Sequence, residues 1–224
     1  MMQRKTLSSL RKLLPLFVVV TFTFGATLPL GAHAEIGEPS VTPALNEKKS
    51  KVFDTFYIAN NVSLSKFKKI HIEEISAEFD KDWLRDNRME ASKRYREKIL
   101  KRYPSLFAEA LKKATEKNTA FNLTDESGPD ALSLSIKMDE LKIYAPDGRN
   151  PSTKKLVKNA GKATLIVEMK NASGEVVGKV VDTRETRDRS PNEYEMTNSL
   201  LNERDFKWLM KIWARYVLEH VENN

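Results

Sequence analysis

The residues best suited to acid–base chemistry in this chain are neighbouring carboxylates. The candidates are Glu73 with Glu74, Asp80 with Asp82, and Asp139 with Glu140. Two carboxyl groups on either side of a glycosidic bond are what a glycoside hydrolase needs. However, adjacent residues of a regular strand point to opposite faces, so neither dipeptide forms a catalytic pair by itself. With 31% charged residues, such pairs also arise by chance. We therefore expect that the protein is not an enzyme.

Other catalytic and ligand-binding groups are scarce. The chain has no cysteine, no Gly-x-Ser-x-Gly turn and three histidines. His71 falls in the middle of an expected strand, and His220 falls in the last turn of an expected helix, where structural roles are the common ones. The segment 148–155 has neither the second glycine nor the Gly-Lys-Ser/Thr of a phosphate-binding loop. These observations predict no catalytic residue, no metal and no cofactor.

An arginine-rich run is the first candidate for binding a partner. Arg184, Arg187 and Arg189 follow an expected strand, and Glu185 and Asp188 are interleaved with them. The local charge is therefore mixed, and runs of this kind are more often solvated strand ends than interfaces. We retain the three arginines as candidate interface residues.

Trp208 is the second candidate. The expected helix 203–221 has an apolar stripe, whose members are Phe206, Leu209, Met210, Trp213, Val217 and Val221. Trp208 lies off the centre of this stripe, so an exposed indole there would indicate a partner surface. The alternative is a partly buried tryptophan at the edge of the core.

The first 34 residues are typical of a secretory signal peptide. A basic start, an apolar middle and the segment Ala32-His33-Ala34 predict cleavage between Ala34 and Glu35. An uncleaved membrane anchor is the alternative, although the apolar stretch is short for a bilayer span. We expect a periplasmic or secreted protein with no stable membrane anchor after cleavage. Without the leader, 34 Lys+Arg face 31 Asp+Glu, so nucleic acid is not expected as a partner.

The remaining chain predicts a flexible lead-in at 35–66 and one α+β domain at 67–224. Alternating apolar residues indicate strands, at 67–76, 119–124, 131–144, 163–170 and 175–184. Helical spacing indicates helices at 82–117, with a kink or break near Tyr103 because Pro104 follows, and at 203–221. The apolar face of 131–144 changes parity near Asp139-Glu140, which predicts a β-bulge there. We expect an antiparallel sheet of about four to five strands, with two amphipathic helices packed on one face.

Three segments carry a resemblance to a known family. They are "GPDALSLSIKMDELKIYAP" (128–146), "GKATLIVEMKNASGEVVGKVVDTR" (161–184) and "FKWLMKIWARYV" (206–217). With these, the chain resembles bacterial envelope proteins, often lipoproteins, grouped as domain-of-unknown-function family thirty-three-thirteen. The resemblance implies a place in the cell envelope. The family has no established activity, so it implies no site residues. Its members typically carry a lipid-anchoring cysteine, which this chain lacks.

The function that these features favour is a non-catalytic secreted or periplasmic domain that binds another cell-envelope component, with an envelope protein as its partner. The alternative is a carrier of a small molecule or glycan, with the loop 145–162 as a lid. A carboxylate-dependent hydrolase is the least favoured of the three.

Overall fold

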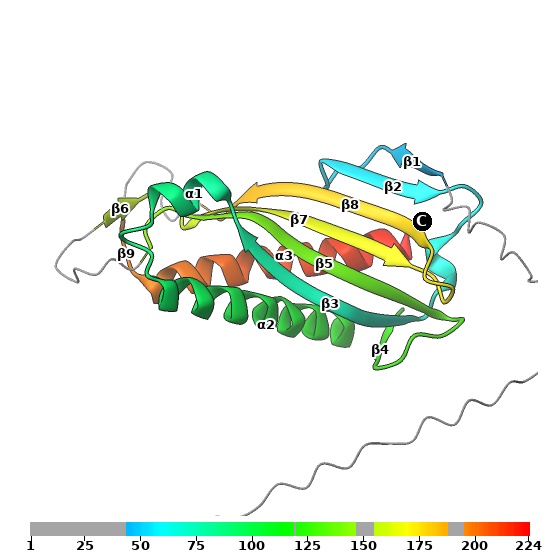
Figure 1. Ribbon diagram of the computed structural model, residues 1–224. Coiled ribbons are helices and arrows are strands. Elements are labelled where there is room, and N and C mark those ends of the chain that lie inside the picture. The colour runs from blue at the N-terminus through cyan, green and yellow to red at the C-terminus, as the bar shows by residue number, and fades with distance from the viewer. Residues whose placement is uncertain (1–43, 119, 147–154, 188–194) are drawn as a thin grey trace, which may run out of the picture. The chain divides into compact units, whose positions relative to one another are not determined.

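The computed structural model describes residues 44–118, 120–146, 155–187 and 195–224 (Figure 1). The expected leader and its cleavage site at Ala34 and Glu35 lie outside these residues. In chain order the elements are β1 (Leu45–Lys48), β2 (Thr55–Ala59), the 3-10 turn η1 (Leu64–Lys66), β3 (Lys69–Phe79), α1 (Lys81–Asp86), α2 (Lys93–Lys117), β4 (Asn122–Thr124), β5 (Ala131–Ile143), β6 (Lys155–Val157), β7 (Gly161–Lys170), β8 (Val176–Glu185), β9 (Glu195–Thr197) and α3 (Ser199–Glu222).

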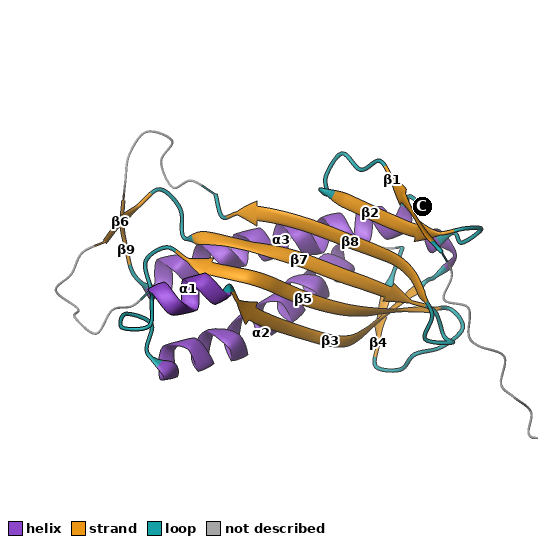
Figure 2. Ribbon diagram, turned by 45° about the horizontal axis from the view of Figure 1, so that its top comes forward, coloured by secondary structure: helices purple, strands orange, loops and turns teal. Residues whose placement is uncertain are grey.

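A seven-stranded sheet forms one layer and two long helices form the other (Figures 1 and 2). The strand order is β1-β2-β8-β7-β5-β3-β4, and β6 and β9 pair separately. Strand β3 runs parallel to both β4 and β5, whereas the other neighbours are antiparallel. Helices α2 and α3 cover the same face of the sheet and run in the same direction. The core lies between the two layers.

The expected antiparallel sheet of four to five strands with two helices is therefore wrong. In the described residues the sheet is mixed, has seven strands, and is accompanied by three α-helices. Its parallel part arises because α1, α2 and β4 all lie in the chain between β3 and β5. Such a long crossover returns the chain in the same direction, whereas a short hairpin would reverse it.

The segment expected as a flexible lead-in contributes two strands. Residues 45–59 form β1 and β2, and β2 pairs antiparallel with β8. Phe56 and Ile58 of β2 are 1% and 2% exposed, because both point into the core. A five-residue strand has a weak alternating signal, so its pairing with a distant strand is not evident from local pattern.

The helix expected over 82–117 is interrupted at a different place. The side chain of Asp80 accepts the backbone N–H of Trp83 and caps α1, and the side chain of Ser92 accepts that of Tyr95 and caps α2. Pro104, expected to mark the break, lies inside α2. The break therefore lies between Asp86 and Lys93, where α1 ends and Ser92 caps the start of α2.

The bulge expected near Asp139-Glu140 is confirmed. The pairing of β5 with β7 shifts register between Asp139 and Lys142, and Glu140 adopts a positive φ of 50°. The extra residue returns the odd-numbered Leu141 and Ile143 to the core face, where both are fully buried.

The helices leave one face of the sheet open (Figure 2), and lysines and carboxylates on it form ion pairs. Its ion pairs are Lys137 with Glu78 (2.7 Å) and Asp139 (3.1 Å), Lys170 with Glu73 (2.7 Å), and Lys179 with Glu168 (3.0 Å). These lysines therefore have carboxylates beside them, which leaves little uncompensated charge around them.

A buried carboxylate joins the two layers. Asp182 of β8 is 1% exposed and accepts the indole N–H of Trp213 in α3 at 2.7 Å. It also accepts the backbone N–H of Asp54 at 3.2 Å and pairs with the Arg184 guanidinium, which in turn donates to the carbonyl of Val52. Three segments that are far apart in sequence are held by this one group, which we call the Asp182 cluster.

The loop between β1 and β2 also holds the C-terminal turn of α3. Ser50 Oγ lies 3.0 Å from His220 Nε2, and the His220 ring makes edge contacts with Phe53 and Phe56 at 4.7 and 5.4 Å between centroids. Burial lowers the pKa of His220 below its ordinary 6.5, while the backbone carbonyl of Tyr216 partly opposes this. Burial therefore favours the neutral imidazole over the charged one.

We predict that Asp182→Ala lowers the free energy of unfolding by about 3 kcal/mol or more, because it leaves the Arg184 charge and the Trp213 N–H without their partner. Urea denaturation followed by tryptophan fluorescence measures this. Glu168→Gln, which breaks an exposed pair on the open face, is the control and should cost less than about 1 kcal/mol. Equal losses in the two variants would show that the Asp182 cluster has no special role.

The buried histidine predicts a pH dependence. Since the folded pKa of His220 is depressed, the unfolded chain binds the proton more readily, and stability is lost as pH falls through 6.5. Denaturation midpoints between pH 8 and 5 should therefore decrease in the wild type and decrease less in His220→Gln. His71→Gln replaces the other histidine of the described residues and serves as the control. A wild-type slope that persists in His220→Gln would contradict the assignment.

Candidate binding groove

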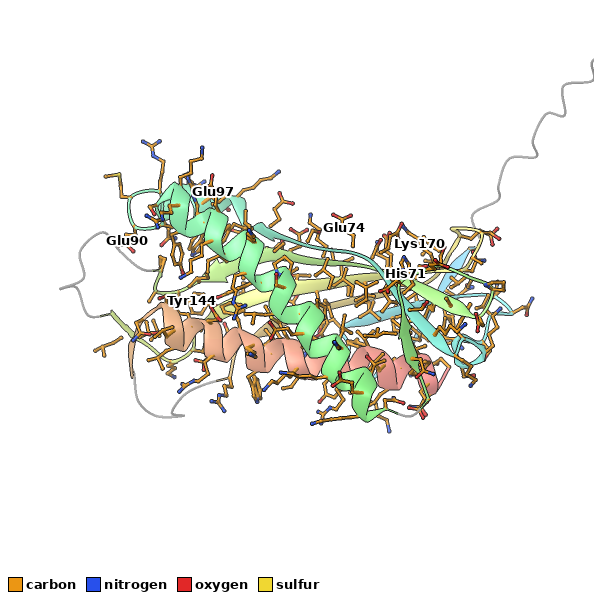
Figure 3. All side chains as sticks on the ribbon, turned by 90° about the horizontal axis from the view of Figure 1, so that it is seen from below. His71, Glu74, Glu90, Glu97, Tyr144 and Lys170 are labelled. Atoms are coloured by element: carbon orange, nitrogen blue, oxygen red, sulfur yellow. The ribbon has the colours of Figure 1, made fainter. Side chains whose placement is uncertain are left out.

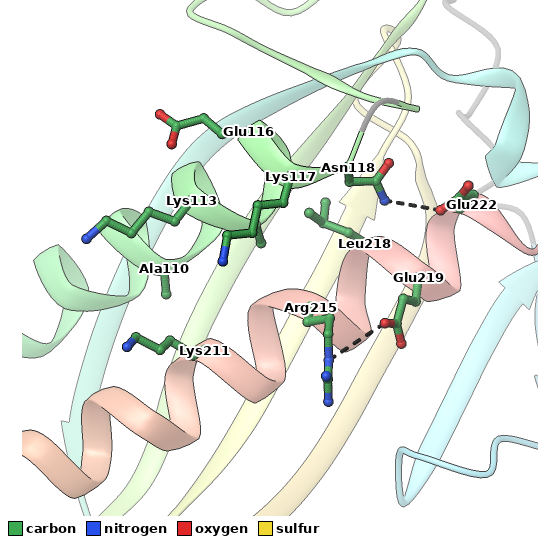
Figure 4. Close-up of a pocket in the computed structure, with 11 residues that line it drawn as sticks. Ala110, Lys113, Glu116, Lys117, Asn118, Lys211, Arg215, Leu218, Glu219 and Glu222 are labelled. Carbon is green, nitrogen blue, oxygen red and sulfur yellow. Dashed lines mark hydrogen bonds and ion pairs between the residues drawn. The ribbon is translucent and has the colours of Figure 1, made fainter.

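A groove of about 640 Å³ runs between the C-terminal halves of α2 and α3 (Figure 4). We call it the α2–α3 groove. Its lining consists of Ala110, Lys113, Ala114, Glu116, Lys117 and Asn118, and of Lys211, Arg215, Leu218, Glu219 and Glu222. It lies on the outer side of the helical layer, away from the sheet's open face.

The amphipathic pattern of the two helices produces this surface. Each helix directs its apolar stripe at the sheet, so the residues at the margins of the two stripes meet along the helix pair. The floor of the groove is formed by side chains that are small or buried: Ala110, Ala114 and Leu218. Small side chains on a helix allow another main chain to approach closely.

Four cations stand along the walls. Lys113 and Lys117 are one helical turn apart on α2, and Lys211 and Arg215 are one turn apart on α3. Residues four apart on a helix share a face, so each helix presents a row of two positive charges. No carboxylate of the described residues lies within ion-pair distance of the amino groups of the three lysines.

Residues of opposite charge on α2 and α3 form ion pairs along the helix pair, which we call the charge ladder. The four cations interrupt it. Nearer the N-termini, Arg102 pairs with Glu203 at 2.8 Å, and Glu109 approaches Lys207 at 3.7 Å. One turn further along, the residue on α2 is Lys113 and the residue on α3 is Lys211. Like charges therefore face the groove from both sides, where an acid on either helix would have continued the ladder.

The lining of the groove has four cations and three acids. Glu219 lies 3.7 Å from Arg215, and Glu222 accepts a hydrogen bond of 3.1 Å from the amide of Asn118. Both belong to the C-terminal end of the groove, and Glu116 of α2 is the third acid (Figure 4). The lining therefore carries one positive charge in excess.

The helix dipole accounts for the position of one of the four cations. The C-terminus of a helix favours a positive charge within about its last turn. Lys117 is the last residue of α2 and meets that condition. Lys211 and Arg215 lie about two to three turns before the end of α3 at Glu222, so the dipole does not account for them.

The sequence-predicted interface residues have varied surroundings. Arg184 belongs to the Asp182 cluster and covers the Tyr216 ring at 5.4 Å. Arg187 lies 5.8 Å from the centroid of the Trp208 ring, and Trp208 is 37% exposed. The structure thus brings Arg187 and Trp208 together, while Arg189 lies outside the described residues.

The carboxylates considered for hydrolysis have structural partners. Hydrogen bonds from Lys170 and Ser135 lower the pKa of Glu73, and the backbone N–H of Trp83 lowers the pKa of Asp80. A general acid needs a raised pKa, so these two groups are shifted in the unsuitable direction. Glu74 belongs to β3 and lies away from the groove (Figure 3). Within the described ranges, no group of three His, Cys, Asp or Glu residues is arranged to hold a metal.

The groove cations were not singled out from the sequence. Their spacing of four on each helix is visible there, but lysines and arginines with this spacing are common on solvated helices. What distinguishes them is the register of α2 against α3, which sets like charges opposite each other. That register depends on tertiary packing.

Comparisons with known proteins do not show a family for this chain. Neither the protein-family models nor the curated proteins contain a match. Among solved structures, the PelC dodecamer from Paraburkholderia phytofirmans aligns with 80% of this chain and 96% of its own, at a TM-score of 0.36 and 10% identity. A substituted form of that dodecamer aligns over 77% and 94%, at 0.35 and 11%.

We predict that Lys113→Glu is more favourable by roughly 0.5 kcal/mol with Lys211 present than in a Lys211→Ala background, because it gives Lys211 an opposite charge across the groove. Within α2 alone the change is unfavourable, since Glu109 and Glu116 become like-charged neighbours and Lys117 becomes an opposite one. Lys112→Glu lies outside the groove and should give the same change in stability in both backgrounds. Urea denaturation at low salt measures all the variants, and equal effects of Lys113→Glu in the two backgrounds would mean that the two lysines do not repel.

Proposed function

We propose that this protein is a non-catalytic domain of the cell envelope that binds an acidic segment of another envelope protein in the α2–α3 groove. The observation that carries the proposal is the interrupted charge ladder, which leaves cations facing one another across a concave surface. An acidic occupant would relieve this repulsion, so binding and electrostatic stabilisation of the helical layer would be coupled.

Concavity favours a protein segment over a bilayer surface. The cations line the walls of a groove, and a flat membrane could reach its rims but not its floor. A single chain can enter the groove, place acids against both walls and cover Ala110 and Ala114. The proposed location follows from the expected signal peptide with cleavage between Ala34 and Glu35. In the described part of the chain, no helix is long and apolar enough to cross a membrane.

A carrier of a small anionic molecule or glycan is the second candidate. The groove volume of about 640 Å³ falls within the range of small-molecule sites. Such sites usually have mostly apolar walls that bury the ligand, whereas here the walls carry four cations. The groove is better suited to an occupant whose charge is spread along its length, as in an acidic peptide segment.

We predict that carbodiimide crosslinking of the envelope fraction, which joins lysine amines to carboxylates in contact, links Lys113, Lys117 or Lys211 to one partner protein. A C-terminal tag recovers the adduct, and mass spectrometry locates the linked residues. The double variant Lys113→Glu/Lys211→Glu should lose the partner, because acids would then face acids.

Two matched variants make this experiment decisive. Lys113→Arg/Lys211→Arg keeps both charges but removes two of the three reactive amines, so it should crosslink less and still retain the partner in an uncrosslinked pull-down. Lys101→Glu/Lys112→Glu makes the same change in net charge on the exposed face of α2 and should behave as wild type. If the partner is retained by Lys113→Glu/Lys211→Glu, or if its links map only outside the groove, the proposed function is wrong.

A further inference from the structure

We infer that the occupant of the α2–α3 groove is an acidic amphipathic helix that packs as a third helix, antiparallel to α2 and α3. This inference rests on the proposed function and specifies the conformation, charge pattern and direction of the bound segment. It is argued from the spacing of the cations, the floor of the groove and the polarity of the two helices.

The spacing of the cations matches a helical ligand. Lys113 with Lys117, and Lys211 with Arg215, each repeat after one turn, a rise of about 6 Å. Carboxylates at positions i and i+4 of a docked helix repeat at the same interval. One row of acids on each flank of that helix would therefore oppose one row of cations on each wall.

The floor of the groove is suited to the apolar seam of a docked helix, meaning the row of side chains that would face it. Ala110 and Ala114 repeat at the same one-turn interval, and Leu218 of α3 is 2% exposed beneath them. Small side chains here let a helix with alanine or leucine along its seam approach closely. The methylene stems of the flanking lysines extend the apolar contact while their amino groups stay at the rims. The lining extends over residues 110–118 of α2 and 211–222 of α3, roughly 12 to 17 Å, so two to three turns of the ligand would be in contact.

The direction follows from the dipoles and from the acids at one end. Because α2 and α3 run in the same direction, both of their partly negative C-termini lie at the same end of the groove. Glu219 and Glu222 line that end as well. The N-terminus of a third helix carries the complementary partial charge. We therefore place the ligand's N-terminus beside Glu222 and its acids toward Lys113 and Lys211.

The test uses three synthetic peptides of 18 residues and equal length. The first has an alanine–leucine seam and glutamates at i and i+4 on both flanks. The second has the same composition with glutamates at every second position, which suits an extended chain. The third replaces every glutamate of the first by glutamine. Affinity is measured by fluorescence anisotropy at two salt concentrations, and helix formation by the difference in circular dichroism on mixing.

We expect the first peptide to bind with a gain of helicity and to bind at least about tenfold more tightly than the other two. Binding should weaken on the order of tenfold in Lys113→Glu/Lys211→Glu, the equivalent of about two lost exposed ion pairs. It should be unchanged in Lys101→Glu/Lys112→Glu. A spin label at the peptide's N-terminus should broaden resonances near Glu222 rather than near Lys211.

The alternatives give different results. Tighter binding of the second peptide, or no binding of any peptide, overturns the helical ligand, while groove crosslinks in the envelope fraction would still support the proposed function. Broadening near Lys211 overturns the antiparallel direction. If vesicles containing phosphatidylglycerol bind instead, and Lys113→Glu/Lys211→Glu releases them, both this inference and the proposed protein partner fail in favour of a membrane surface.

Discussion

The Asp182 carboxylate is the constraint on which the arrangement of the two layers depends. It is buried between β8 and α3, where an unpaired charge would be costly, so its partners must be present together. The Trp213 indole determines how α3 is rotated about its axis, and the backbone N–H of Asp54 brings in the loop between β1 and β2. With this orientation and the buried apolar stripe of α3, Lys211 and Arg215 lie beside α2.

Charged side chains are paired to different extents on the two outer surfaces of the protein. On the open face of the sheet, the side chains of Lys137, Lys170 and Lys179 have carboxylates within 3.0 Å. Across the helical layer, pairing occurs near the N-termini and stops at the groove. Solvation alone does not require this difference, because both surfaces are exposed to water. An acid at position 113 would continue the pairing, and its absence is the feature from which the proposed binding role is inferred.

Local pattern in the sequence accounts for much of the fold but not for the site. The stripe of α3, the strands β5, β7 and β8, and the bulge at Asp139-Glu140 all follow from periodicity. The pairing of β2 with β8 and the parallel course of β3 beside β5 do not, because both depend on contacts between residues far apart in the chain. The groove belongs to this second class. Lys113 and Lys211 are ordinary surface lysines until the register of the helices sets them opposite each other.

Arg184 shows why residue type and position are not enough to identify an interface. It and Arg187 end the same polar run, and arginine is favoured both at interfaces and at buried carboxylates. The structure gives them different surroundings: Arg184 pairs with the buried Asp182 at 2.5 Å, whereas Arg187 is 45% exposed beside Trp208 and lies 4.0 Å from the buried Asp205. Changing Arg184 would therefore disturb α3 and, through it, the groove. A loss of partner binding in such a variant would report on folding, whereas charge changes at Lys113 and Lys211 act on the groove itself.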